Sequence, residues 1–505
     1  MRILTSIRSR LAKGSLWISG GRGLSNLLTV LSTFVLARLL VPEDFGLVAL
    51  ASTSLAILNS LTNLSMASAL IHHKSPADDH YHTAWTLGII RGFVLACIFC
   101  VAAWPLAILY SEPRLDDVMY ALSASVILNG FTNPRLIKMQ KELVFWQVFV
   151  LSVANNFVFA VVSVSIAVSY QTYWALVIGT IAGQLTSTVL SYSLFPFRPR
   201  FSWKHGRELW SFSMWLTLSQ VVDTLNYRFD HMLVGGVLGR ASLGFYTVGS
   251  SLATVATREA VKPLTQTLFP AFSLLSGDPG SLRNAYQRAQ ALVTAVALPA
   301  GLGTALIADP LVRLAMGEAW APAIIIVQAI GAIYAFGTLG SLAASVAMAQ
   351  GITATLFRRA LLQFVLRVPL ILLGMYYWGF VGLIYARTAV GAITILINMQ
   401  LIYRMTGLTV AAQLRANIRC LAAGAVMIGA VLIVQWAFPT GGGNAGLALL
   451  ILFSIVVGTV SYIVTSGLLW LLSGRPIGPE SEALVLSKAL INLATHRRLA
   501  RIRED

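Results

Sequence analysis

Apolar stretches as long as a membrane span alternate with short polar stretches along almost the whole chain of 505 residues. Fourteen such stretches lie at residues 15–40, 45–71, 84–110, 116–137, 144–169, 172–195, 211–238, 242–272, 286–308, 322–349, 357–377, 379–402, 413–437 and 446–472. A helix needs roughly 20 residues to cross the hydrocarbon core of a bilayer. Runs of about ten residues with alternating polarity, which are typical of membrane barrels, are not seen. Because lipid offers no partners to free backbone groups, we predict an all-α polytopic membrane protein with about fourteen transmembrane helices.

The composition agrees with this fold class. Hydrophobic residues make up 57% of the chain and charged residues only 11%, whereas a soluble protein carries about 25% charged residues. The connections between the apolar stretches are short, and none is long enough to form a soluble domain. The sequence therefore excludes an ordinary soluble enzyme.

Lysine and arginine collect on alternate connections. If the N-terminus is cytoplasmic, 25 of the 36 basic residues fall on cytoplasmic segments, and only Arg114, Arg240 and Arg313 fall on the opposite connections. Cytoplasmic loops of membrane proteins carry an excess of Lys and Arg. The pattern predicts a multi-pass protein with both termini in the cytoplasm. The net charge of +17 then reflects topology, and no nucleic-acid partner is expected, because the basic residues do not share one soluble face.

The chain repeats itself at an interval of about 200 residues. LLVPEDFGLVALASTSLA (39–56) resembles VLGRASLGFYTVGSSLAT (237–254), and this alignment places Gly46 on Gly244. YWALV (173–177) resembles YWGFV (377–381). Each repeat holds six predicted helices, and because six is even, both repeats enter the membrane from the same side. Parallel repeats of this kind form transporters in which one half moves against the other around a central site.

The repeats predict the domain organisation. We expect a six-helix N-terminal lobe over residues 1–203 and a six-helix C-terminal lobe over 204–405. Two additional transmembrane helices and a basic cytoplasmic tail are expected over 406–505.

Charged residues within the apolar stretches are the candidates for a functional site. A charged side chain at the bilayer centre costs about 2.5–3.5 kcal/mol on insertion scales, so it usually faces a cavity or a partner. The predicted cationic cavity is formed by Arg22, Arg228, Arg258, Lys262 and Arg387, and the candidates for ion coupling are Asp223, Asp230 and Glu259. Arg91 and Arg367 are weaker candidates, because they are expected near span ends.

Each of these groups also has a structural interpretation. Arg22 and the Arg258–Lys262 pair are explained equally by contact with headgroups at the membrane surface, and Asp223 can pair internally with Arg228. Arg258 and Lys262 are separated by four residues and therefore share one helix face, where like charges repel. A bound anion such as a diphosphate removes that repulsion, because arginine binds phosphate through two parallel hydrogen bonds.

Four motifs, in this order and spacing, resemble a known family. They are ARLLVPEDFGLVAL (37–50), the glycine pattern from Gly236 to Tyr246, LFPAF (268–272) and GEAW (317–320). The chain resembles polysaccharide flippases of the Wzx type, especially the colanic-acid-exporter branch, whose superfamily includes multidrug and toxin extruders and the lipid II flippase. The resemblance implies a V-shaped pair of six-helix lobes around a cavity.

The resemblance also implies a function in the bacterial inner membrane. The substrate is expected to be an undecaprenyl-diphosphate-linked oligosaccharide repeat unit, used for exopolysaccharide, O-antigen or capsule biosynthesis. Translocation makes and breaks no bond, so we predict no enzymatic activity and no cofactor; coupling to a proton or sodium gradient is implied. Membrane lipids, a polysaccharide polymerase and glycosyltransferases are the expected partners.

Three alternative functions remain open. A cation-coupled drug extruder of the same superfamily favours acidic cavity residues, but basic residues within the predicted spans outnumber acidic ones seven to three. A membrane polysaccharide polymerase or ligase usually carries its catalytic residues on a large outer loop, and the outer loops here are short. A scaffold for glycosyltransferases leaves the charges within the spans unexplained.

Three other sets of residues have structural interpretations. Cys97 and Cys100 form a CxxC motif within an apolar stretch, where a buried structural pair is expected. The His-rich loop at 72–82 matches no fixed metal spacing, and no metal site is predicted. Six tryptophans lie near predicted span ends, as in an interfacial belt, and stacking of some of them on sugars is the alternative that stays open: Trp85, Trp104, Trp174, Trp203, Trp320 and Trp378.

Overall fold

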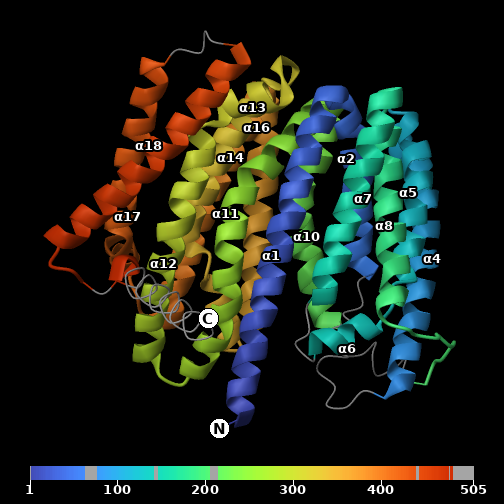
Figure 1. Ribbon diagram of the computed structural model, residues 1–505, viewed down its shortest axis with the longest axis horizontal. Coiled ribbons are helices and arrows are strands. Elements are labelled where there is room, and N and C mark those ends of the chain that lie inside the picture. The colour runs from blue at the N-terminus through green and yellow to red at the C-terminus, as the bar shows by residue number, and fades with distance from the viewer. Residues whose placement is uncertain are drawn as a thin grey trace, which may run out of the picture. The chain divides into compact units, whose positions relative to one another are not determined.

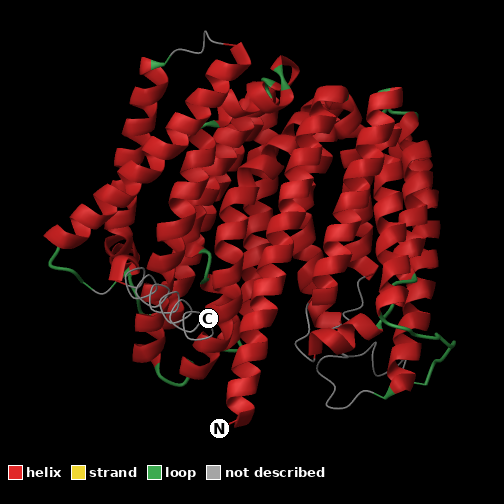
Figure 2. Cartoon of the chain, viewed as in Figure 1, coloured by secondary structure: helices red, strands yellow, loops and turns green. Residues whose placement is uncertain are grey.

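The computed structural model describes residues 2–62, 77–141, 146–204, 214–438, 443–476 and 478–481. Within this part of the chain every regular element is a helix, and the connections are short turns and loops (Figure 2). The prediction of an all-α fold is confirmed.

The helices group into two compact units. Unit 1 comprises Met1–Leu252, Ala315–Ala323 and Ala360–Ala386, and unit 2 comprises Ala253–Leu314, Ile324–Arg359 and Arg387–Asp505. The two long helices α11 (Gly239–Leu275) and α16 (Thr353–Thr406), which are labelled in Figure 1, contribute residues to both units.

The other helices lie within or mainly within one unit. In unit 1 they are α1 (Arg2–Leu39), α2 (Pro42–Thr62), α4 (Asp78–Leu109), α5 (Arg114–Gly130), α6 (Arg135–Lys141), α7 (Trp146–Tyr170), α8 (Trp174–Leu194) and α10 (Met214–Val237). In unit 2 they are α12 (Pro279–Leu306), α13 (Ala308–Met316), α14 (Ala323–Gly337), α15 (Ala343–Ala349), α17 (Val410–Ala437) and α18 (Gly443–Leu472).

In the described part of the chain, each predicted apolar stretch falls on one of these helices or on consecutive helices; residues 63–71, 144–145 and 211–213 of three stretches lie outside that part. Among the described residues, eight helices are long and apolar enough to cross a membrane. A helix is the expected element for such apolar segments, because it satisfies its own backbone hydrogen bonds in a medium without water. The count of fourteen crossings stays a prediction.

Local sequence signals set the helix ends. At the start of α12, Asp278 is the N-cap residue, and its carboxylate accepts a hydrogen bond from the Gly280 amide at 3.0 Å. Pro279 occupies the first turn, where its missing N–H leaves no bond unmade. Hydrogen bonds from Ser281 and Gly280 hold the pKa of the Asp278 carboxyl below its usual value.

The long helix α16 is two helices joined by a sharp break. Gly379 has φ of 55° and ψ of −132°, which is not helical and which a residue with a side chain rarely adopts. A Cβ on Gly382 would lie 1.9 Å from the carbonyl oxygen of Gly374, so the two arms approach closely beside the break. The division that the sequence predicts between residues 377 and 379 is therefore found at Gly379.

Gly46 and Gly244, which the repeat places on each other, make reciprocal contacts in unit 1. A Cβ on Gly46 would lie 1.9 Å from the carbonyl oxygen of Arg240, and a Cβ on Gly244 would lie 2.0 Å from that of Pro42. Pro42 and Arg240 each precede their repeat's glycine by four residues. The first turns of α2 and α11 therefore cross through equivalent backbone atoms, as two repeats related by a two-fold axis do.

Trp320 packs on this crossing and is fully buried. Its ring meets Phe45 and Phe245 edge-on, at centroid distances of 5.1 and 5.8 Å. Its Nε1 donates a hydrogen bond to the Ala37 carbonyl at 2.8 Å. The expectation that Trp320 belongs to an interfacial belt is wrong, because its indole fills the junction between the two repeats' helices.

We predict that Gly46→Ala destabilises the folded protein. The added Cβ meets backbone oxygen that cannot move without displacing α11, and overpacking of this kind costs about 1–3 kcal/mol. The purified variant should unfold at a lower temperature than the wild type in detergent. Gly429→Ala on α17 is the matched control, since nothing lies within 4 Å of its Cβ position; equal unfolding temperatures for both variants would contradict the contact.

Candidate functional site

A carboxylate and a guanidinium are buried together among the apolar helices of unit 1. Asp230 of α10 is inaccessible to solvent, and Arg367 of α16 is only 9% exposed. The Arg367 Nε donates to Asp230 Oδ1 at 2.8 Å, and its Nη2 forms an ion pair with Oδ2. The pair is bidentate, which is the strongest geometry available to arginine and a carboxylate.

Aromatic groups complete the surroundings of this pair. The Tyr246 hydroxyl donates to Asp230 Oδ2 at 2.8 Å. The His231 ring meets Tyr246 edge-on at 5.2 Å and stacks on Tyr227 at 6.4 Å. Asp230 thus accepts three hydrogen bonds, which compensate much of the cost of removing its charge from water.

The sequence predicts neither the partner nor the depth of this pair. Asp230 is predicted as a candidate for ion coupling, and Arg367 as a weaker residue near a span end. The structure instead buries Arg367 and brings it to Asp230 across 137 residues of chain. A signal was present, because Arg367 is the only charged residue in the apolar run LLQFVLRVPLILL and had to find a partner there.

The other predicted site residues are not gathered within one unit. Arg228 belongs to unit 1 and lies over the Tyr227 ring at 5.6 Å. Arg258, which is exposed, Glu259 and Arg387, which are partly buried, belong to unit 2. The side chains of Arg22, Asp223 and Lys262 lie outside the described residues, so the predicted Asp223–Arg228 pair and the common cationic cavity stay predictions.

A second polar feature of unit 1 is a cavity of about 190 Å³ among α2, α4, α5 and α8. Its lining includes the guanidinium of Arg91 and the amides of Asn59, Asn129 and Gln184. Arg91 donates to the Asn59 carbonyl at 3.2 Å and to its side-chain oxygen. A guanidinium beside amide groups is suited to a hydroxyl-rich or phosphate-bearing ligand, because amides both donate and accept hydrogen bonds.

Glycines bring two helices together beside this cavity. A Cβ on Gly130 of α5 would lie 2.8 Å from the carbonyl oxygen of Gly88 of α4. The two helices therefore approach backbone to backbone, and both glycines belong to the lining of the cavity. The sequence analysis named Arg91 only as a weaker candidate and did not name its amide neighbours, although Asn59, Asn129 and Gln184 are also unusual within membrane spans.

Basic residues predicted on the outer connections have carboxylate partners. Glu112 pairs with Arg114 at 2.9 Å and also with Arg240, and Arg313 pairs with Asp309 at 2.8 Å. Each of these three arginines therefore has a carboxylate beside it, and Glu112 pairs with two of them. The orientation of the chain in the membrane stays a prediction.

The remaining expectations concern histidine, cysteine and tryptophan. His80 Nδ1 accepts a hydrogen bond from the Ala77 amide, and His82 Nδ1 accepts one from the Arg200 amide, both at 3.2 Å. Among the described residues no group of three His, Cys, Asp or Glu side chains is placed to hold a metal; His72 and His73 lie outside them. Cys97 is exposed, so the expected buried Cys97–Cys100 pair is wrong.

Trp85 also departs from the expected interfacial belt. It is 8% exposed, and its Nε1 donates to the Tyr192 hydroxyl at 2.7 Å. Trp104, Trp203 and Trp378 are exposed, as the belt requires.

Comparisons with known proteins identify the family. The chain is 24% identical to the lipopolysaccharide biosynthesis protein WzxC of Escherichia coli over 75% of this chain and 77% of that protein. It is 23% identical to the succinoglycan biosynthesis transport protein ExoT of Rhizobium meliloti, and spans 61% of its length. A structure of the lipid II flippase MurJ in an inward closed conformation matches 90% of this chain and 98% of its own, with a TM-score of 0.71 and 15% identity.

A multidrug resistance MATE family transporter in an inward-facing conformation has the same fold over 76% of this chain and 96% of its own, with a TM-score of 0.60 and 12% identity. The sequence profile of the polysaccharide biosynthesis protein family matches residues 35–325. This match covers more than half of the chain, and the protein therefore belongs to the polysaccharide biosynthesis protein family.

Proposed function

We propose that this protein moves lipid-linked oligosaccharides across the bacterial inner membrane. Family membership supports this function, as do the relatives named for lipopolysaccharide biosynthesis and succinoglycan transport. A third relative, TuaB of Bacillus subtilis, is named for teichuronic acid biosynthesis and is 19% identical.

The observation that carries the proposal is the cavity at Arg91. It places one guanidinium beside three amides within apolar helices, a combination that pairs a phosphate-binding group with donors and acceptors for sugar hydroxyls. A drug extruder that binds organic cations gains nothing from a guanidinium in its cavity, because like charges repel. A polymerase needs reacting groups, whereas translocation needs only a polar path.

In the mechanism we propose, the lobes at 1–203 and 204–405 move against each other, and the helices and tail at 406–505 are additional. The reciprocal contact of Gly46 and Gly244 supports related lobes. Arg22, Arg228, Arg258, Lys262 and Arg387 attract the diphosphate, the polyprenyl tail stays in lipid, and the sugar passes through a hydrated cleft. No bond is made or broken. Both termini lie in the cytoplasm, and a polymerase and glycosyltransferases work beside the protein.

Coupling to a proton or sodium gradient is part of this proposal, with Asp223, Asp230 and Glu259 as its candidates. For Asp230, binding a cation requires that the carboxylate first leave Arg367, because the bidentate pair and Tyr246 occupy both of its oxygens. While it is closed, the pair links α10 to α16 as a neutral unit and holds the two helices in register.

We predict that Arg91→Gln lowers translocation by about tenfold or more, because the loss of a charge-assisted hydrogen bond costs about 1.5–3 kcal/mol. The measurement is transfer of a fluorescent lipid-linked oligosaccharide in proteoliposomes. Surface polysaccharide in a complemented deletion strain, at equal protein abundance, is the second readout. Arg404→Gln, an exposed arginine in the last turn of α16, is the matched control.

Normal translocation by Arg91→Gln, at wild-type abundance, would remove the cavity from the substrate path. If the deletion strain kept its polysaccharide but became sensitive to cationic drugs, the extruder function would replace the proposed one.

We predict that Asp230→Asn and Arg367→Gln each destabilise the protein by about 3–5 kcal/mol, since each leaves an uncompensated buried charge. The double variant Asp230→Asn/Arg367→Gln should recover a large part of this loss, because it leaves no net charge. Thermal unfolding of the three purified variants in detergent measures the effect. Additive losses in the double variant would show that the two residues do not act as a pair.

A further inference from the structure

A cavity of about 550 Å³ lies in unit 2, at the N-terminal ends of α12 and α17 and beside the segment that follows α18. Three arginines line it: Arg288 from α12, and Arg415 and Arg419 from α17. Asn284, Gln287 and Ser473 add polar groups to the lining. The volume falls within the range of small-molecule sites, which is about 300–1,000 Å³.

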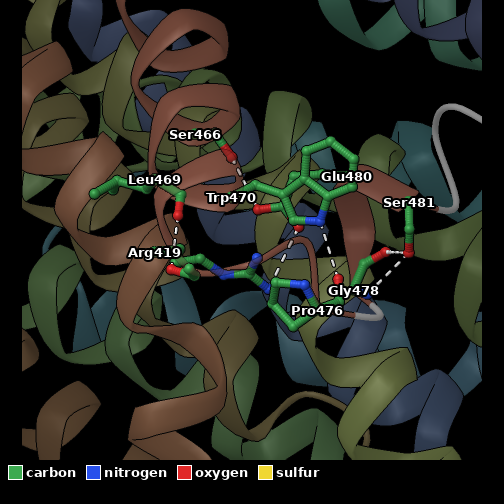
Figure 3. Close-up of polar contacts among 9 residues, drawn as sticks. Arg419, Ser466, Leu469, Trp470, Pro476, Gly478, Glu480 and Ser481 are labelled. Atoms are coloured by element: carbon green, nitrogen blue, oxygen red, sulfur yellow. Dashed lines mark hydrogen bonds and ion pairs between the residues drawn. The ribbon is translucent and has the colours of Figure 1, made fainter.

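The segment after α18 lies against α17 and α18 (Figure 3), and its residues Pro476, Gly478 and Pro479 belong to the lining of this cavity. Trp470 Nε1 donates to the Pro476 carbonyl at 2.9 Å, and the Ser466 hydroxyl donates to Glu480 at 3.2 Å. Glu480 in turn pairs with Arg419 at 3.4 Å. These contacts hold the segment that follows α18 against α17 and α18, so residues of this segment contribute a fixed part of the cavity lining.

Gly478 lets this segment lie against Arg419. A Cβ at this position would lie 2.7 Å from Arg419 Nη2, so a side chain there would push the guanidinium away. The Gly478 amide donates to the Ser481 hydroxyl at 2.9 Å, which fixes the turn. The local chain is therefore shaped around the arginine.

The cavity has an excess of positive charge. Glu480 compensates Arg419, but in the described part of the chain no carboxylate pairs with Arg288 or Arg415. The Nη1 of Arg419 is also buried and receives no acceptor from the described residues. A buried donor on a cation without an acceptor is costly, and an anion in the cavity removes that cost.

The position of the cavity favours a lipid headgroup over a free anion. It lies where three membrane helices begin or end, which is the level of headgroups in a bilayer. Leu414, Ile418 and Leu472 nearby expose apolar side chains, as helices in contact with acyl chains do. Basic pockets between membrane helices on the cytoplasmic side are suited to anionic lipid headgroups.

We propose that this arginine pocket, formed by Arg288, Arg415 and Arg419, binds the phosphate of a lipid headgroup in the cytoplasmic leaflet. The ligand is either an anionic phospholipid of the bilayer or a polyprenyl phosphate carrier, since both present a phosphate above an apolar chain. This site is separate from the cavity at Arg91, and its occupancy does not depend on the proposed transport function.

The test is lipid binding to the purified full-length protein in neutral detergent, measured by native mass spectrometry. The probes are phosphatidylglycerol, undecaprenyl phosphate, diacylglycerol, which lacks phosphate, and inorganic phosphate. The pocket variant is Arg288→Gln/Arg415→Gln. The matched control is Arg283→Gln/Arg404→Gln, which removes two exposed arginines of unit 2 that do not line the cavity.

We expect the pocket variant to bind at least one phosphate-bearing lipid about tenfold or more weakly than the wild type, while the control variant does not. Diacylglycerol should not bind in this way. Tighter binding of undecaprenyl phosphate than of phosphatidylglycerol identifies the carrier as the ligand, and the reverse order identifies the bilayer phospholipid.

Equal lipid binding by the pocket variant and the control would overturn the proposal, as would binding of inorganic phosphate that matches that of the lipids. Thermal unfolding checks that the pocket variant is folded. If it is not, the single variants Arg288→Gln and Arg415→Gln, each at an exposed residue, carry the same comparison.

Discussion

A charge that leaves water for the interior of an apolar helix bundle needs a partner, and this constraint explains the contacts of two charged groups that the structure describes in unit 1. Asp230 meets it by accepting two hydrogen bonds from Arg367 and one from Tyr246. Arg91 meets it through Asn59 and a cavity lined by amides. In each case the partners come from different helices, so meeting the constraint also fixes how those helices pack.

The repeats depend on a second constraint, the close approach of backbones. At the crossing of α2 and α11, Gly46 and Gly244 each face a carbonyl oxygen that leaves no room for a Cβ. Small residues at helix interfaces allow such an approach in membranes, where packing rather than hydrophobicity drives association. Trp320, which comes from a third segment, then fills the space between Phe45 and Phe245. The equivalent helices of the two repeats, α2 and α11, thus pack directly against each other, with Trp320 filling the space beside them.

Much of the fold could be predicted from the sequence, because hydropathy and span length are local properties. Span lengths predicted the break at Gly379, and the internal repeat predicted the correspondence of Gly46 with Gly244. The site was harder to predict. Arg367 and Asp230 are 137 residues apart, and only tertiary packing sets which charge meets which. Trp320 was misplaced for the same reason, since a tryptophan near a span end is either interfacial or buried, depending on its neighbours.

The arginines of the two units differ in how their charge is compensated, and the difference follows from how far each side chain is buried. Within the apolar stretches of unit 1, Arg367 is neutralised by a carboxylate of the same unit, because an unpaired charge at that depth is costly. At the helix ends of unit 2, Arg288 and Arg415 are exposed and can retain their charge, since water and headgroups are within reach. Arg419 is the least exposed of the three, and among the described residues it alone pairs with a carboxylate, that of Glu480. A phosphate is therefore bound at least cost at the helix ends, whereas deeper in the membrane it must displace or share an existing partner. A protein that moves a phosphate-bearing lipid needs such partners to be exchangeable, and the amides beside Arg91 meet this requirement better than the bidentate carboxylate beside Arg367.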